Sequence, residues 1–233
     1  MKTIGLLGGM SWESTQGYYS AINRGVRARC GGLHSAKIAL YSVDFAPLAA
    51  AQHQGDWAGA AALLVEGAKR VEAAGADFLL LCTNTMHKLA PELSQALSIP
   101  LVHIADATGE ALVQAGVRRV GLLGTAFTME QDFYKGRLAQ GFGLEVLVPD
   151  ESDRALVHDV IYQELCQGRI EAASRAQYLQ VIDRLAARGA QAVILGCTEI
   201  GLLVGQGDTP VPLFDTTALH AQKAVALATA QLP

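Results

Sequence analysis

The chain has few charged residues and no long apolar run. Only 17% of its 233 residues are charged, against about 25% in a typical globular domain, while 51% are apolar. No apolar stretch approaches the roughly 18 residues that a membrane-spanning helix needs, so no membrane protein is expected. The net charge of −4 leaves no excess of Lys and Arg to meet phosphates, which argues against nucleic-acid binding. We therefore expect a soluble protein with many short buried elements.

Paired cysteines, metal-ligand spacing and an export signal are also missing. The histidines show no zinc-ligand spacing, and no CxxC pair occurs among the four cysteines: Cys30, Cys82, Cys166 and Cys197. The apolar residues 4–10 are interrupted by three glycines and followed by Trp12 and Glu13, unlike a signal peptide. We therefore expect reduced thiols, no metal and a cytoplasmic protein.

Short apolar runs alternate with longer helical patterns along the chain. Strands are expected at residues 3–7, 37–43, 77–81, 101–104, 119–123, 145–148, 191–195 and 211–214. Helices are expected at 14–28, 57–74, 87–97, 107–115, 130–139, 155–187 (broken near Gly168) and 217–230. Wholly apolar strands followed by helices are typical of parallel sheets buried on both faces. The fold class is therefore predicted to be α/β.

An internal repeat divides the chain. IGLLG at residues 4–8 recurs as VGLLG at 120–124, and CTNT at 82–85 recurs as GCTE at 196–199. A weaker third echo pairs residues 104–108 with 214–217. The repeat predicts two similar Rossmann-like halves related by a pseudo-twofold axis. The halves are expected at residues 1–98 and 99–214, with a C-terminal helix at 215–233 packing on the first.

The repeat also predicts a candidate site. It aligns Thr83 with Cys197, and ligands of open α/β sheets bind beyond the carboxyl ends of the strands. We therefore expect Thr83 and Cys197 to approach one ligand from opposite sides of a cleft between the halves. Small or polar residues follow them at the two strand-to-helix junctions: Asn84, Thr85, Thr198 and Glu199. Free N–H groups at such junctions favour a carboxylate or phosphate.

Two cysteines raise alternatives. Helix N-terminal N–H groups lower the pKa of a thiol, which would make Cys197 a base or nucleophile rather than a buried core residue. Cys82 competes with Thr83, because adjacent side chains on a strand point to opposite faces and only one of the two can face the ligand. The repeat favours Thr83, whereas a bulge at the junction would favour Cys82.

Other polar residues lie near the same strand ends. His87 and His103 are either general bases or structural residues, the second within a strand. Gln52 and His53 fall in a polar stretch between a strand and a helix, where substrate side chains are often recognised. The turn at residues 8–11 is glycine-rich, so a ligand can approach its backbone. It lacks the G-x-G-x-x-G spacing of a dinucleotide site.

Residues 5–15 (GLLGGMSWEST), the pair Asn84-Thr85 with His87, and GCTE at 196–199 together resemble the aspartate/glutamate racemase family. The similarity covers essentially the whole chain and is greatest to the bacterial L-aspartate/glutamate-specific or broad-specificity branch. It implies an amino-acid racemase that uses no pyridoxal phosphate, metal or nucleotide. It also implies a homodimer of two-domain chains with the site between the domains.

The resemblance assigns roles as well. Family members carry one catalytic cysteine in each half; the second matches Cys197, and the first matches Thr83, because the family's Cys-Asn-Thr reads Thr-Asn-Thr here. Cys197 would take the Cα proton of an L-amino acid and Thr83 would reprotonate the far face. The residues expected to bind the substrate are Met10, Ser11, Gln52, Asn84, Thr85, Thr198 and Glu199.

One departure concerns the substrate's distal carboxylate. Family members specific for aspartate hold it with basic residues, whereas the matching segment here is Gln52-His53-Gln54 and another family lysine is matched by Glu164. Lys135 and Arg137 are the candidates to replace that charge, and the substrate range is expected to extend beyond aspartate and glutamate.

Three competing functions are considered. The first is a related enzyme: a hydantoin racemase, a maleate isomerase or a malonate-type decarboxylase. The second is a two-lobed amino-acid-binding protein without catalysis, and the third an NAD-dependent oxidoreductase, which the missing fingerprint weakens. The Thr83/Cys197 pairing and the opening at residues 8–10 favour the amino-acid racemase.

Overall fold

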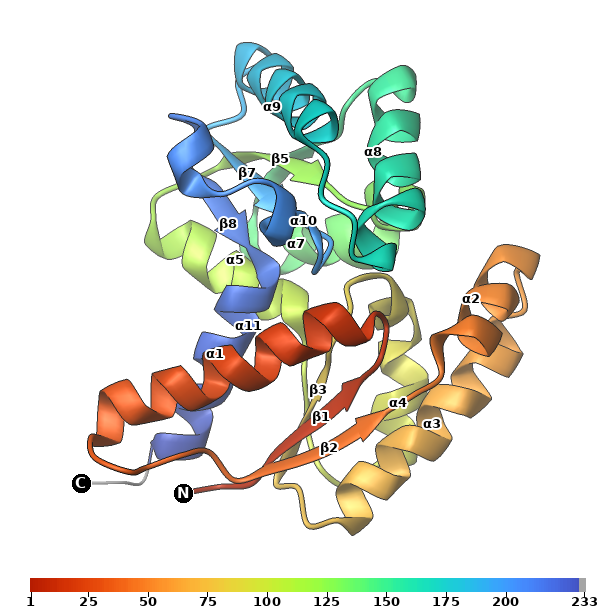
Figure 1. The fold of residues 1–233 in the computed structure, drawn as a ribbon, viewed down its shortest axis with the longest axis vertical. Helices are drawn as coiled ribbons and strands as arrows, with labels where there is room; N and C mark the ends of the chain where they lie inside the picture. Colours follow the sequence, from red (N-terminus) through yellow and green to blue (C-terminus); the bar gives the residue numbers. More distant parts are fainter. Residues whose placement is uncertain (231–233) are drawn as a thin grey trace. The chain divides into compact units, whose positions relative to one another are not determined.

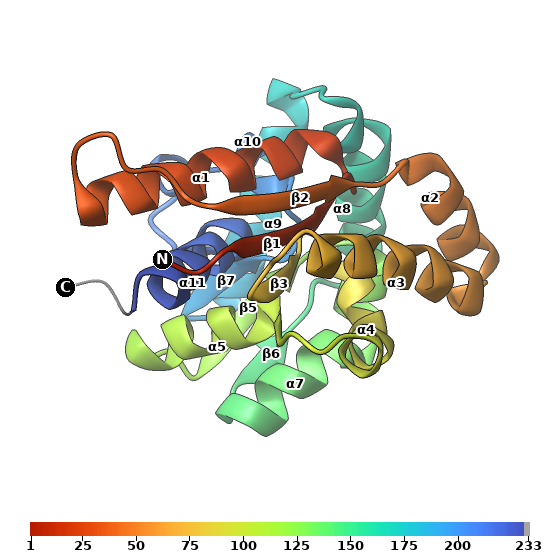
Figure 2. The same ribbon diagram turned by 90° about the horizontal axis from the view of Figure 1, so that it is seen from below.

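A computed structural model of the chain describes residues 1–230. The chain folds into two compact units, the first Met1–Ile104 with residues 220–230 and the second Ala105–Leu219. Each unit contains one four-stranded sheet with parallel pairing throughout. Figures 1 and 2 show the ribbon of both units from two sides. The α/β class with parallel sheets is thus confirmed. The pseudo-twofold axis and the cleft concern the relative placement of the halves and stay predictions.

The first unit has the strand order β2-β1-β3-β4. Its strands are β1 (Ile4–Gly8), β2 (Ile38–Ser42), β3 (Phe78–Leu81) and β4 (Leu101–Val102). Its helices are α1 (Trp12–Cys30), α2 (Phe45–Gln54), α3 (Trp57–Ala73), the 3₁₀ helix η1 (Thr85–Leu89), α4 (Ala90–Ala96) and most of α11 (Thr216–Thr229). The last three residues of the helix predicted at 215–233 lie outside the described residues.

Alternation along β1 and β3 fills both faces of this sheet. Leu6 and Leu80 pack in one cluster with residues of α1 and α11. Leu7 and Leu81 pack in the other cluster with residues of α3 and α4. The wholly apolar strands that suggested a doubly covered sheet are therefore buried on both sides.

The second unit has the equivalent order β6-β5-β7-β8. Its strands are β5 (Arg119–Leu123), β6 (Glu145–Leu147), β7 (Ala192–Leu195) and β8 (Leu213–Asp215). Its helices are α5 (Ile104–Gln114), α6 (Ala126–Glu130), α7 (Asp132–Phe142), α8 (Glu151–Gln163), η2 (Leu165–Gln167), α9 (Ala172–Ala187), α10 (Ile200–Leu203) and η3 (Gln206–Asp208). Strand order and crossovers repeat those of the first unit, as the sequence repeat predicts.

Several element predictions were wrong in detail. The stretch expected to be a polar connection is helix α2, which Asp44 caps by accepting the N–H of Ala46 and which ends at Gly55 in the left-handed region. His103 follows β4 rather than lying in a strand. The helix expected at 87–97 begins as the 3₁₀ helix η1, and the one expected at 130–139 is the pair α6 and α7.

Candidate active site

The turn after β1 is fixed by glycines and a short hydrogen-bond chain. Gly9 has φ +96° and a Cβ there would clash with the Val43 carbonyl, so only glycine fits. The Gly9 N–H donates to Oγ1 of Thr15 at 2.9 Å, and that hydroxyl donates to the Ser11 carbonyl at 2.8 Å. Ser11 caps α1, and the Met10–Ser11 peptide bond is cis. Met10 and Ser11 are both buried in this turn.

The register of the central strands decides which residue matches Cys197. Leu7 pairs with Leu81 in the first sheet, as Leu123 pairs with Leu195 in the second. The Cys82 N–H then donates to the Leu7 carbonyl. In the second unit the Gly196 N–H donates to the Leu123 carbonyl in the same way. Cys82 is therefore equivalent to Gly196, and Thr83 is equivalent to Cys197.

The surroundings of Cys82 agree with this register. Its side chain is fully buried and packs in the core cluster that contains Tyr18 and Ile22. Burial raises the pKa of the Cys82 thiol far above its ordinary value. A protonated thiol inside the core is poorly suited to act on a ligand.

The predicted residues after β3 are buried at the start of η1. Thr83, Asn84 and Thr85 are 8%, 2% and 6% exposed. The ring of His87 makes two hydrogen bonds with the backbone beside them. Its Nδ1 donates to the Thr83 carbonyl at 2.7 Å, and its Nε2 accepts the Ile104 N–H at 3.2 Å. His87 therefore contacts Thr83 through the backbone.

Gln52 and His53 differ in surroundings. The side chain of Gln52 is buried on α2, whereas His53 is exposed and its Nδ1 donates to the Ala49 carbonyl. Neighbouring residues on a helix point about 100° apart, so only one can face inward. Of this segment, Gln52 remains the candidate to contact a ligand.

The predicted residues after β7 bind one another. Cys197 Sγ donates to Oε2 of Glu199 at 2.9 Å, and Oγ1 of Thr198 donates to the same oxygen at 2.8 Å. All three side chains are buried. The carboxylate that was expected to contact substrate is thus hydrogen-bonded to the candidate base.

The expected lowering of the Cys197 pKa was wrong. Burial raises this pKa well above its usual value, and the Glu199 carboxylate adds to the effect. The helix invoked for lowering it, α10, begins only at Ile200 and has four residues, too few for a substantial dipole. The neutral thiol is consequently the favoured form of Cys197.

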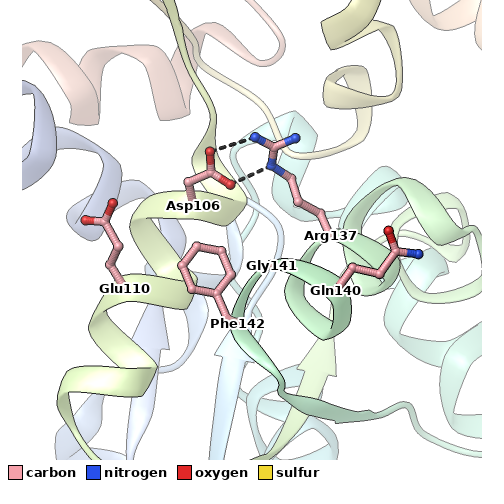
Figure 3. Close-up of a pocket in the computed structure, with 6 residues that line it drawn as sticks. All are labelled: Asp106, Glu110, Arg137, Gln140, Gly141 and Phe142. Atoms are coloured by element: carbon pink, nitrogen blue, oxygen red, sulfur yellow. Dashed lines mark hydrogen bonds and ion pairs between the residues drawn. The ribbon is translucent and has the colours of Figure 1, made fainter.

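The two cations expected to hold a distal carboxylate have other partners. Arg137 donates from Nε and Nη2 to the Asp106 carboxylate at 2.5 and 2.7 Å, as Figure 3 shows. Arg137 and Asp106 line a pocket of about 470 Å³ between α5 and α7, and apart from Arg137 none of the residues expected at the site lines it. Lys135 Nζ donates to the Glu130 carbonyl, and Glu164 accepts from Ser174.

A hydrogen-bond network beside the ring of His87 could not be predicted from the sequence. The Tyr18 hydroxyl contacts Nδ1 of His220 at 2.9 Å, and Nε2 of His220 donates to the Val102 carbonyl at 2.8 Å. Tyr18 and His220 are 202 residues apart, and no local pattern links them.

Among residues 1–230, no group of His, Cys, Asp and Glu side chains could hold a metal ion. No helix in that range is long and apolar enough to cross a bilayer.

Comparisons with known proteins found a matching family, similar sequences and similar structures. The sequence model of the Asp/Glu/hydantoin racemase family matches residues 7–224. A Yersinia pestis crystal structure, of a protein proposed to be an Asp/Glu racemase, is 54% identical with TM-score 0.90, covering 98% of this chain and 99% of that one. An aspartate racemase homologue from Pyrococcus horikoshii is 34% identical with TM-score 0.84, covering 98% and 100%. The broad-specificity amino-acid racemase of Bacillus subtilis is 26% identical over 70% of this chain and 69% of its own.

Proposed function

Because the chain belongs to the Asp/Glu/hydantoin racemase family, and is therefore an amino-acid racemase, we propose that it interconverts L- and D-aspartate and L- and D-glutamate by two-base proton transfer at Cα. The observation that carries this proposal is the equivalent placement of Thr83 and Cys197, each two residues past its central strand. The proposal requires both side chains to reach one substrate from opposite faces.

Cys197 serves the face from which the L-enantiomer loses its proton. The raised pKa favours the thiol, so a base must first remove the thiol proton. Glu199 Oε2 is the hydrogen-bond acceptor at 2.9 Å and takes that proton. The thiolate then takes the Cα proton, which leaves a carbanion on the substrate and a thiol on Cys197.

Thr83 serves the opposite face. Its hydroxyl gives a proton to the carbanion, which completes inversion. The alkoxide is then reprotonated from solvent and Glu199 releases its proton to solvent, so both groups return to their starting states. A hydroxyl is a weak acid and a poor base, so we expect turnover from the D-enantiomer to be slower per binding event than turnover from the L-enantiomer. The equilibrium itself stays at equal amounts, since enantiomers have the same free energy.

The carbanion needs electrostatic stabilisation, because an amino-acid Cα–H is a very weak acid. Asn84, Thr85 and the backbone at Thr198 are the proposed donors to the α-carboxylate, and the turn at Met10 and Ser11 lines the ligand. Gln52 is the proposed contact for the distal group. An uncharged amide there favours a substrate range wider than the two acidic amino acids.

The proposal needs no cofactor, since both proton-transfer groups are side chains. We further propose that the protein is a homodimer, as the family resemblance implies, and that it is cytoplasmic, as its widely spaced cysteines predict. Light scattering coupled to size exclusion measures the mass of the assembly, and a mass of one chain would contradict the dimer.

Solvent exchange tests the proposed reaction. The protein is incubated with each common L-amino acid in D₂O, loss of the Cα proton is followed by NMR, and chirality is determined by chromatography. We expect exchange and D-product with aspartate and glutamate, both lost in Cys197→Ala. Exchange that survives in Cys197→Ala removes this thiol from the mechanism. Turnover of hydantoins, maleate or arylmalonates in place of amino acids would favour a related enzyme.

A further inference from the structure

Three histidines lie buried together behind Thr83 in the first unit. His87, His103 and His220 are 1%, 7% and 0% exposed. The ring centroids of His87 and His103 are 4.4 Å apart, and those of His87 and His220 are 6.0 Å apart. They come from η1, the residue after β4, and α11. Segments distant in sequence therefore converge on the ring that contacts Thr83.

The contacts of His87 fix its tautomer. Nε2 accepts the Ile104 N–H, so this nitrogen carries no proton. Nδ1 therefore carries the ring proton and donates it to the Thr83 carbonyl, which can only accept. Protonating Nε2 would set it against the N–H of Ile104, which removes His87 from consideration as a general base.

The bond to Thr83 replaces one that a regular helix would supply. In an α-helix the backbone N–H of residue 87 would reach the carbonyl of residue 83. Here η1 is a 3₁₀ helix, and the His87 N–H bonds to the Asn84 carbonyl instead. The Thr83 carbonyl is held by the His87 side chain, at 2.7 Å, and Asn84 makes no side-chain cap.

The ring of His87 is itself held in place. His220 lies beside it and is bound on both sides, by the Tyr18 hydroxyl on α1 and by the Val102 carbonyl on β4. Ile104, at the start of α5, supplies the other bond to His87. The position of the Thr83 peptide is thereby tied to strand β4 and to helices α1, α5 and α11.

We propose that His87 is a positioning residue for the reaction: it sets the orientation of Thr83 by holding its carbonyl, and it transfers no proton itself. This inference rests on the proposed role of Thr83. Its consequence is specific, because a misplaced Thr83 would slow proton delivery to one face of the carbanion. Abstraction by Cys197 on the other face would continue. Once the Cys197 thiol has exchanged its proton with solvent, it would return a solvent proton to the carbanion and regenerate the L-enantiomer.

The test compares two variants that each keep one of the two bonds of the ring. Asn in His87→Asn places its amide N–H₂ where Nδ1 lies and retains the donor to Thr83. Gln in His87→Gln reaches the position of Nε2 and retains an acceptor for the Ile104 N–H. Each loses one buried hydrogen bond, so a purely structural role would affect them alike.

The reaction is run in D₂O from L-aspartate, and two products are measured. One is L-aspartate that has gained deuterium with its configuration retained, and the other is D-aspartate. The readout is the ratio of the first to the second. We expect His87→Gln to raise this ratio about tenfold or more, the size of a general-acid contribution partly lost, and His87→Asn to stay within about threefold of wild type. Thr83→Ala should raise the ratio, and adding His87→Gln to it should change nothing further.

The outcomes are separable from failure of the proposed function. Wild-type protein without exchange or inversion would contradict the racemase reaction itself. Wild-type activity with an unchanged ratio in His87→Gln, both rates falling together, would overturn the positioning role alone. Melting curves check that each variant is folded. If His87→Gln does not fold, a raised ratio in folded His87→Asn overturns the inference, and an unchanged ratio alongside the Thr83→Ala increase supports it.

Discussion

Cys197 Sγ donates to Glu199 Oε2 at 2.9 Å, and Thr198 donates its hydroxyl proton to the same oxygen at 2.8 Å. The candidate base is thus bonded to a buried carboxylate that both disfavours the thiolate by its charge and offers a place for the thiol proton. Such opposing effects are common where a group must change protonation state during a reaction.

The first prediction concerns pH. Loss of the Cys197 proton to solvent is a second route to the thiolate, besides transfer to Glu199, and the raised thiol pKa means that this route keeps growing with pH beyond the ordinary thiol range. The kcat/KM for L-aspartate should therefore still be rising above about pH 9. Glu199→Gln removes the proton acceptor, so the rate near neutral pH should fall. It also removes the negative charge, which lowers the Cys197 pKa and moves the rising limb to lower pH. The profile is measured by polarimetry.

Thr198→Val is the matched control for that profile. It removes the second donor to Glu199 without changing any charge, so the limb should keep its position even if the rate falls. A limb that moves to higher pH in Glu199→Gln would contradict the electrostatic role of Glu199.

The second prediction separates Thr83 from Cys82. Thr83→Ala should lower racemisation by about 100-fold or more, the usual value of a general acid, while deuterium still enters L-aspartate. Thr83→Cys should raise the D-to-L rate, because a thiolate is a better base than a hydroxyl. Cys82→Ala should keep the activity, since its side chain packs in the core.

Chiral chromatography of the product decides between the outcomes. Loss of activity in both directions in Thr83→Cys would contradict the assignment of Thr83. Loss in Cys82→Ala, with an unchanged melting curve, would transfer the role to Cys82.

The repeat was the part of the sequence from which most of the fold followed. It identified the two sheets because IGLLG and VGLLG form the central strands β1 and β5. Short apolar runs of this kind can be recognised from neighbouring residues alone. Helix α2 was missed although Asp44 and Gly55 are ordinary capping residues, because only Leu48 and Gln52 are buried on it and the apolar periodicity is weak.

The positions of the candidate residues at the strand ends could be predicted, but their contacts could not. Thr83, Cys197 and their followers could be located because strand ends are visible in sequence. That Glu199 bonds to Cys197 depends on side-chain direction after β7, and that Arg137 pairs with Asp106 depends on the packing of α7 against α5. Neither is encoded by spacing along the chain.

The third prediction concerns the turn after β1. Gly9→Ala would place a Cβ against the Val43 carbonyl at φ +96°, so it should lower the free energy of unfolding by about 2 kcal/mol or more. Gly17→Ala is the matched control: it lies within α1 with open space around the new Cβ, and should stabilise by about 1 kcal/mol. Urea denaturation measures both, and a neutral Gly9→Ala would show that the turn adjusts freely.

The fourth prediction concerns Asp215, at the end of β8. Burial raises the pKa of its carboxyl group. Asp215 also accepts hydrogen bonds from the Thr217 and Ala218 N–H groups, which lower this pKa, but burial is the larger effect. A folded-state pKa above the unfolded value of about 3.9 means that folding favours the protonated acid. The contribution of Asp215 is then fully present below that value and is lost as pH rises through the folded-state pKa.

Asp215→Asn keeps an acceptor for both N–H groups and has no charge at any pH. Its free energy of unfolding relative to wild type should therefore increase from about pH 4 to about pH 7.5, measured by urea denaturation at each pH. Asp215→Ala also removes the charge but loses the acceptor, so it should follow the same trend about 1 kcal/mol lower. A difference between Asp215→Asn and wild type that falls with pH would mean that the carboxylate is stabilised in the folded protein, against the burial that surrounds it.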